Sequence, residues 1–145
     1  MNNIVRYQDW EARLSVYLDR VAEEPFKWGT HDCALFASDC VLAMTGVDPA
    51  EAYRGTYDTV VGAAKALREH GAGTLLKSFT ATFGEPISPH FAQRGDLVML
   101  DPKTIGVCVG RHSWFVGREA NQEGLVPLFT ASCRYAFRVP FEAAA

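Results

Sequence analysis

The hydrophobic pattern of the chain changes character after Gly84. Before that residue, apolar side chains recur every three or four positions, which is the period of helices that bury one face. After it, Pro86 and Pro89 interrupt the helical pattern, and short β-rich runs alternate with turn residues. Helices followed by consecutive strands predict an α+β fold with an antiparallel meander rather than alternating βαβ units.

The helical half, residues 1–84, contains start and stop signals for several helices. Asp9 is a candidate cap for the first helix. A helix that carries Cys33 is expected to begin with Thr30 and to stop at Gly46, and Asp48-Pro49 is expected to start another short helix. The other predicted helices cover residues 9–22, 56–70 and 74–82, and the strands of the sheet half (85–145) cover residues 96–100, 105–109, 113–116, 125–129 and 135–139.

Length and composition fit a single domain over residues 1–145. Of the 145 residues, 48% are hydrophobic, which is enough to build a core. The formal net charge of −3 and the lack of a Lys/Arg run give no basic surface, so nucleic acid is not an expected partner. Four cysteines are too few for a disulfide scaffold and too widely spaced for a zinc knuckle, so we expect reduced thiols, no metal and no cofactor.

The chain shows no targeting or membrane signal. Its first residues lack the basic start and apolar core of a signal peptide. No stretch approaches the roughly 20 apolar residues that a membrane span requires. We therefore expect synthesis in the cytoplasm and no membrane span.

Cys33 is the candidate nucleophile of the chain. It follows the run Trp28-Gly29-Thr30-His31-Asp32 and is expected in the first turn of a helix, where free backbone N–H groups and the helix dipole stabilise a thiolate. That position predicts a lowered thiol pKa. A purely structural role is the alternative, because Cys33 also continues a helical stripe of apolar residues that would be buried: Phe36, Ala37, Cys40, Val41 and Met44.

Three segments in this order resemble the NlpC-type cell-wall peptidases, which are small papain-like enzymes. They are Asp32-Cys33 at a helix start, the run Gly95-Asp96-Leu97-Val98, and the run Ile105-Gly106-Val107. The resemblance implies a papain-like NlpC-type fold, with a buried Cys-bearing helix packed on a C-terminal, five-stranded antiparallel sheet. Together with Trp28-Gly29, the turn at 45–49 and the closing run at 135–139, these segments look like a small branch encoded among phage and prophage tail genes.

The chain departs from that family at the catalytic histidine. Alignment of Ile105-Gly106-Val107 with the family's Val-Gly-Ile places Thr104 where the histidine belongs. A threonine hydroxyl cannot take a thiol proton near neutral pH, so it cannot act as the general base. The family's third polar residue would fall near Val116 or Gly117, and neither can orient an imidazole.

Other residues near Cys33 are weaker candidates for the base. His31 lies two positions before Cys33 and can reach the thiol only if residue 31 is not helical. Asp32 is expected to support the helix start, because an ordinary aspartate is too acidic to hold a thiol proton. The remaining histidines are expected at a helix end, in an exposed loop and in a turn, in the order His70, His90 and His112.

Two functional hypotheses follow from the resemblance. The first is a structural component of a phage tail tip or baseplate with a degenerate catalytic site, made in the bacterial cytoplasm, incorporated in the virion tail, and bound to other tail proteins. Its interfaces would use some of the aromatic residues: Trp10, Trp28, Trp114, Phe115, Phe129 and Phe141.

The second hypothesis is an active thiol hydrolase that cleaves peptidoglycan, with Cys33 as nucleophile and His31 as an improvised base. A partner subunit that donates a histidine to the site would reconcile the two hypotheses. An acyl-carrier or transferase activity is a third possibility, and it rests on Cys33 alone. The sequence leaves enzymatic activity open.

Overall fold

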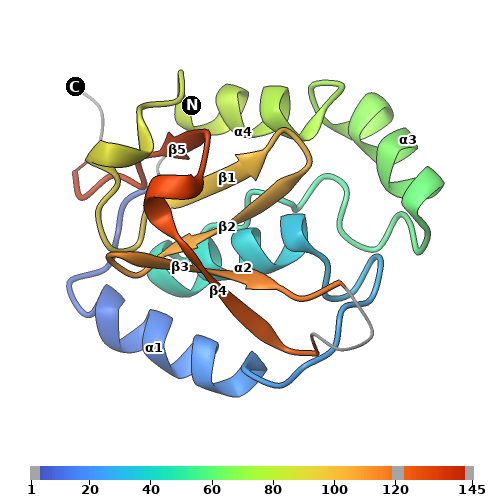
Figure 1. Cartoon of the computed structure of the whole chain (residues 1–145). Coiled ribbons are helices and arrows are strands. Elements are labelled where there is room, and N and C mark those ends of the chain that lie inside the picture. Colours follow the sequence, from blue (N-terminus) through green and yellow to red (C-terminus); the bar gives the residue numbers. More distant parts are fainter. Residues whose placement is uncertain (1–3, 119–122, 143–145) are drawn as a thin grey trace.

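The computed structural model describes residues 4–118 and 123–142. Within these residues the chain forms four α-helices and a five-stranded antiparallel sheet, which confirms the predicted α+β class (Figure 1). The helices are α1 Trp10–Val21, α2 Cys33–Thr45, α3 Val60–His70 and α4 Leu75–Phe83, with short 3-10 helices η1 Pro89–Phe91 and η2 Thr130–Ser132. The strands are β1 Leu97–Asp101, β2 Thr104–Cys108, β3 His112–Val116, β4 Leu125–Phe129 and β5 Tyr135–Phe137.

The sheet has the strand order β4-β3-β2-β1-β5. Its first four strands form the predicted meander, but the prediction was wrong for β5, which crosses back to pair with β1. Leu97 of β1 therefore faces Val107 of β2 on one side and Phe137 of β5 on the other. The crossing is fixed by long-range backbone bonds, such as that from the Arg134 N–H to the Met99 carbonyl (2.8 Å).

Helix α2 lies against one face of the sheet and forms the centre of the main core. It packs against α1 on one side and β2 on the other. Ten of its thirteen residues are buried, so the apolar stripe that contains Cys33 is part of a helix enclosed on most sides. The rest of this core comes mainly from α1, α4 and the inward-facing residues of the strands.

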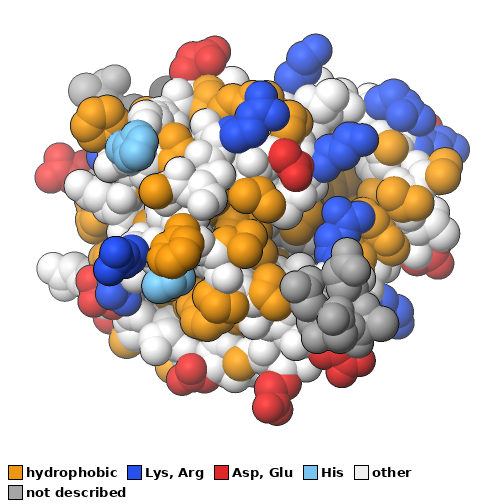
Figure 2. Space-filling view, in the orientation of Figure 1, with side chains coloured by type: hydrophobic (Ala, Val, Ile, Leu, Met, Phe, Trp, Pro, Cys, Tyr) orange, Lys and Arg blue, Asp and Glu red, His pale blue; other side chains and the backbone are white. Residues whose placement is uncertain are grey.

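The opposite face of the sheet carries a smaller core. Val98, Cys108, Phe115, Cys133 and Ala136 are buried there, beneath the segments that contain η1 and η2. Hydrophobic side chains remain visible over β3 and β4 on this face (Figure 2). The sheet is thus covered by the main core on the α2 side and by a smaller core on the other.

Capping residues set the helix boundaries where the predictions were wrong. Helix α2 begins at Cys33 rather than Thr30, because Asp32 adopts an extended backbone and accepts a hydrogen bond from the Leu35 N–H. Helix α3 begins at Val60 rather than at residue 56, because the Thr59 hydroxyl accepts from the Gly62 N–H. The spacing of apolar residues carries no information about these capping hydrogen bonds. The predictions based on it therefore started both helices too early.

Two aspartates behave differently from their predicted roles. Asp9 precedes α1 but makes no side-chain cap bond, and it pairs instead with Arg13 at 2.7 Å. Asp48-Pro49 starts a series of turns rather than a helix. The Asp48 carboxylate accepts from the Ala50 N–H and pairs with Arg54, and these contacts hold the segment in its turn conformation.

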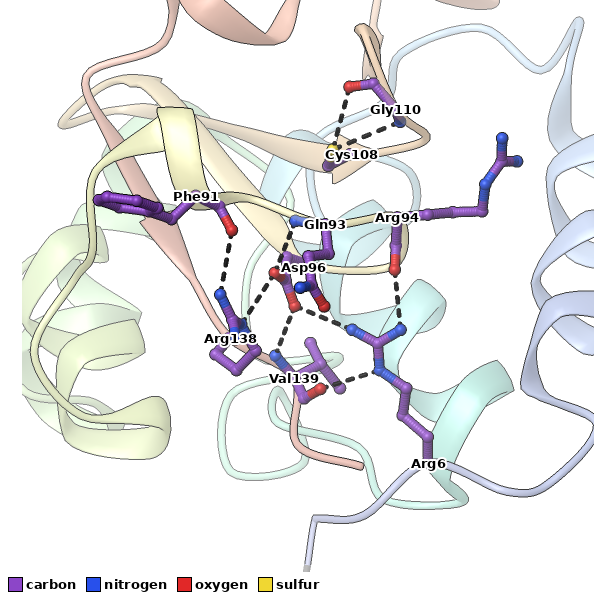
Figure 3. A network of polar contacts seen from close by, with 9 residues as sticks. All are labelled: Arg6, Phe91, Gln93, Arg94, Asp96, Cys108, Gly110, Arg138 and Val139. Carbon is purple, nitrogen blue, oxygen red and sulfur yellow. Dashed lines mark hydrogen bonds and ion pairs between the residues drawn. The ribbon is translucent and has the colours of Figure 1, made fainter. Parts of the chain in front are cut away.

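A buried carboxylate joins the two ends of the described chain to β1 (Figure 3). Asp96 is fully buried and pairs with Arg6 at 2.8 Å and with Arg138 at 3.1 Å. It also accepts hydrogen bonds from the backbone N–H groups of Gln93 and Val139. Four donors around one carboxylate compensate for the removal of its charge from water.

Arg6 is enclosed as tightly as its partner. Its guanidinium also donates to the carbonyls of Val139 and Arg94, and it packs against the rings of Trp10 and Phe141 at 4.3 and 4.2 Å from their centroids. Gly95 has a φ of +91°, and a Cβ there would lie 2.5 Å from Arg6 Nη1. The Gly-Asp run therefore has a structural reason: glycine leaves room for the arginine, and aspartate binds it.

We predict that Asp96→Ala lowers the free energy of unfolding by about 3–5 kcal/mol, because it leaves the Arg6 charge buried with fewer partners. Chemical denaturation with matched baselines measures the change. Asp9→Asn, which disrupts the exposed Asp9–Arg13 pair, is the control and should have no measurable effect. A loss for Asp96→Ala as small as that of the control would contradict the prediction.

Candidate functional site

Cys33 lines a cavity of about 420 Å³. It is the first residue of α2 and is 6% exposed. Its Sγ lies 3.5 Å from the Lys103 carbonyl oxygen in the turn between β1 and β2, within reach of a weak S–H donation. The cavity lies between the start of α2, one face of α3, and this turn, with Arg118 after β3 on its wall.

Burial controls the chemistry of the thiol. Removal from water raises the pKa of Cys33 to about 11, and the nearby Asp32 carboxylate adds to the increase. The backbone N–H groups of Ile105 and Ala34 and the charge of Arg118 lower the pKa, but by less. The predicted lowering of the thiol pKa was therefore wrong, because desolvation outweighs the electrostatics of the helix start.

Asp32 is the cap of α2 and is fully engaged. It is 1% exposed. Its carboxylate accepts from the backbone N–H groups of Leu35 (2.9 Å) and Gly29 (3.0 Å) and from the Tyr57 hydroxyl. Sequence reasoning missed Tyr57, because it lies in a loop 25 residues further along the chain and no local pattern links the two. These bonds leave Asp32 to organise the start of α2 rather than to move a proton.

The His31 ring lies away from the Cys33 cavity. Residue 31 is not helical, which was the condition for its reaching the thiol, but its backbone is held by a bridge to Lys27. Its Nδ1 lies 3.2 Å from Glu24 Oε2, and the ring meets Phe36 edge-on at 6.0 Å between centroids. The ring is 2% exposed, and Nε2 has no hydrogen-bond partner among the described residues.

Neither His31 nor any other histidine of the chain lines the Cys33 cavity. His70 ends α3, and His90 lies exposed in η1. His112 begins β3 rather than a turn, and its ring stacks on Phe129 at 4.9 Å between centroids.

The residues on either side of Thr104 contact the Cys33 thiol. Lys103 and Ile105, which flank Thr104, both direct backbone groups at the Cys33 sulfur. The Thr104 hydroxyl itself donates to Asp101 at 3.3 Å. Val116 and Gly117, at the predicted place of the third polar residue, are both buried. The described residues around the sulfur thus supply hydrogen bonds but no group that titrates near neutral pH.

Residues 5–139 match a family described as a domain of unknown function, DUF6950. The chain belongs to the DUF6950 family. Neither the curated proteins nor the solved structures contain a match to it. Among the described residues of this DUF6950 domain, no three His, Cys, Asp or Glu side chains are grouped so that they could hold a metal ion. The helices of the described part are also too short or too polar to cross a membrane.

We predict that iodoacetamide does not label Cys33 in the folded protein at pH 7. A thiol with a pKa of about 11 is thiolate in only on the order of one molecule in ten thousand at that pH, and this one is also buried. Peptide mass mapping across pH 5 to 9 measures the labelling of each cysteine. The denatured protein is the control, and all four of its cysteines should be labelled. Fast labelling of Cys33 near pH 6 in the folded protein would contradict a buried thiol with a raised pKa.

We predict that the stability of the fold decreases as the pH falls below about 6.5, the ordinary pKa of histidine, in part through His31. Burial lowers the pKa of His31, against opposing effects of Glu24, Asp39 and Asp32. The folded state therefore favours the neutral ring, and its contribution is present above the unfolded pKa and lost as the pH falls through the lowered value.

Denaturation of wild-type protein and His31→Leu between pH 7.5 and 5 tests this prediction. Wild type should lose up to about 1.4 kcal/mol more per pH unit than the variant, which is the limit for one proton. His90→Gln, at an exposed position, controls for the loss of an imidazole as such. Parallel profiles for wild type and His31→Leu would show that His31 does not contribute.

Proposed function

We propose that this domain is a papain-like, NlpC-type domain without hydrolase activity that serves as a structural component of a phage tail tip or baseplate. The observation that carries the proposal is the absence of all four histidines from the Cys33 cavity. Peptide hydrolysis by a thiol requires a group that takes the thiol proton and returns it to the leaving amine. The Cys33 thiol has a raised pKa and no imidazole beside it. It therefore has no group to take its proton or to protonate the leaving amine.

The arrangement of the fold supports the NlpC-type part of the proposal. A cysteine begins a helix that is buried against an antiparallel sheet, and the second strand starts next to its sulfur. Thr104 at that start occupies the place that the resemblance gives to the catalytic histidine. The Gly95-Asp96 run has a separate, structural reason in the contacts with Arg6, so its presence in the chain does not require retained catalysis.

The distribution of aromatic residues supports a role in assembly. Of the aromatic residues considered for interfaces, Trp10 and Phe115 are buried in the core, whereas Phe129 and Phe141 are 54% and 50% exposed. Phe91, which lies in η1, is 69% exposed. Exposed aromatic side chains of this kind are enriched at protein interfaces. Partners would be other tail-tip or baseplate proteins.

An active peptidoglycan hydrolase is the second candidate, and one observation favours it. The Cys33 sulfur borders a cavity, and its surroundings include the Arg118 charge and the N–H groups of Ile105 and Ala34. Such donors can stabilise an oxyanion. A base donated by a partner subunit in the assembled tail would then be required.

We predict that Thr104→His makes Cys33 more reactive. The backbone groups on both sides of residue 104 approach the sulfur, so an imidazole at this position that turns toward the thiolate would pair with it and lower its pKa, and alkylation near pH 7 should rise by at least about tenfold. Thr104→Gln is the matched control, because it adds a side chain of similar length without a titratable group. Equal alkylation of Thr104→His and Thr104→Gln would show that an imidazole at residue 104 does not activate the thiol.

Purified peptidoglycan distinguishes the two candidate functions. Wild-type protein and Cys33→Ala should both fail to release soluble fragments, as measured by chromatography with mass detection. Release by wild type that Cys33→Ala abolishes would overturn the proposed loss of activity. Mass spectrometry of purified phage particles tests the tail assignment, and absence of the chain from particles produced by its own prophage would overturn it.

A further inference from the structure

The rim of the Cys33 cavity is positively charged. Arg68 of α3, Lys103 of the β1–β2 turn and Arg118 after β3 all line it and are exposed. None of the three forms an ion pair within the described residues. Figure 2 shows this side of the molecule hollowed next to α3, with Lys and Arg side chains around the hollow.

The carboxylate in the cavity wall does not neutralise these cations. Asp32 accepts hydrogen bonds from Leu35, Gly29 and Tyr57, and it is 1% exposed. Its position is fixed by its role as the cap of α2. Among the described residues, the cavity lining has three cations and no free carboxylate, and this arrangement favours an anionic ligand.

The wall of the cavity is apolar, in contrast to its rim. Helix α3 presents a face of apolar residues to it, and Val60 on that face is 56% exposed, so this surface is not covered by the rest of the domain. The neighbouring side of α3 packs Ala66 into a small cluster with Leu35, Ala50 and Tyr53. The apolar lining residues are Trp28, Ala34, Val60, Ala63, Ala64, Leu67, Leu75 and Pro102.

Arg118 brings a positive charge next to Trp28, an apolar residue of the cavity lining. Its guanidinium carbon lies 5.4 Å from the centroid of the Phe26 ring and 5.3 Å from that of Trp28, which themselves contact each other edge-on. Its charge also contributes to lowering the Cys33 pKa, so its field reaches the thiol. A ligand anion next to Arg118 would therefore place its apolar part along α3.

We propose that this cavity binds a compact amphiphilic anion, a molecule with one carboxylate and a medium-length apolar body. The volume of about 420 Å³ lies within the range of small-molecule sites. The carboxylate pairs with Arg118 and Lys103, while the apolar body contacts the face of α3. An extended peptide is disfavoured, because an apolar wall leaves its backbone N–H and C=O groups without partners. The inference rests on the proposed function in one respect, that the ligand is held and not cleaved.

Titration with octanoate, followed by two-dimensional NMR of the full chain, tests the inference. Octanoate should shift the amide signals of α3 and of the first turn of α2. Octanol and octylammonium, which have the same apolar body, should bind at least about fivefold more weakly, because they lack the charge that the rim attracts. Octanol binding as tightly as octanoate, or shifts confined to other parts of the domain, would overturn the inference.

Variants of the rim and the wall locate the site. Arg118→Gln and Lys103→Gln should each raise the octanoate dissociation constant about fivefold, whereas Arg111→Gln, an exposed arginine outside the cavity, should not change it. Ala63→Phe should fill the cavity and abolish binding. The spectrum of each variant verifies that it is folded, and equal affinity across all four variants would overturn the site.

This experiment is separable from the test of the proposed function. Failure to bind octanoate leaves the peptidoglycan result unchanged, because that assay measures cleavage. Conversely, release of peptidoglycan fragments by wild type would overturn the proposed loss of activity while the octanoate affinity remained as measured. The two results therefore identify which of the two proposals is wrong.

Discussion

The joining of the two ends of the described chain to β1 depends on the ion pairs of the buried Asp96 carboxylate. A charge in the interior is tolerated only when donors surround it, and two of its four donors belong to arginines at opposite ends of the chain. Arg6 and Arg138 must therefore return to the start of β1. That requirement explains why β5 pairs with β1 rather than with β4, which precedes it in the chain.

Sequence patterns predicted the parts of the fold that depend on local periodicity. The change of pattern after Gly84 separates the helices from the sheet, and β4 occupies residues 125–129 as expected. Patterns failed where a single distant contact decides the outcome. The caps at Asp32 and Thr59 shorten two helices, and the bond from Arg134 to Met99 directs β5 to the other edge of β1. No local run of residues contains that information.

The candidate site shows the same division. Asp32 and Cys33 are adjacent in sequence, and their place at a helix start was predictable. Tyr57 and Arg118 reach them from distant loops, and burial reverses the expected direction of the thiol pKa. A helix terminus stabilises an anion by a modest amount, whereas removal of a thiolate from water costs more. The degree of burial, which only the assembled fold determines, therefore decides the state of Cys33.

The contacts of Arg6 have a consequence for how the domain can be joined to other chains. Its backbone N–H donates to the Pro140 carbonyl at 3.0 Å, so the first and last described segments run side by side. Helix α3, which lines the Cys33 cavity, lies on the far side of the molecule from these two segments in Figure 1. A linker that joins these two segments would permit circular permutation, and insertion of the domain through them into a loop of a host protein would leave the cavity facing outward.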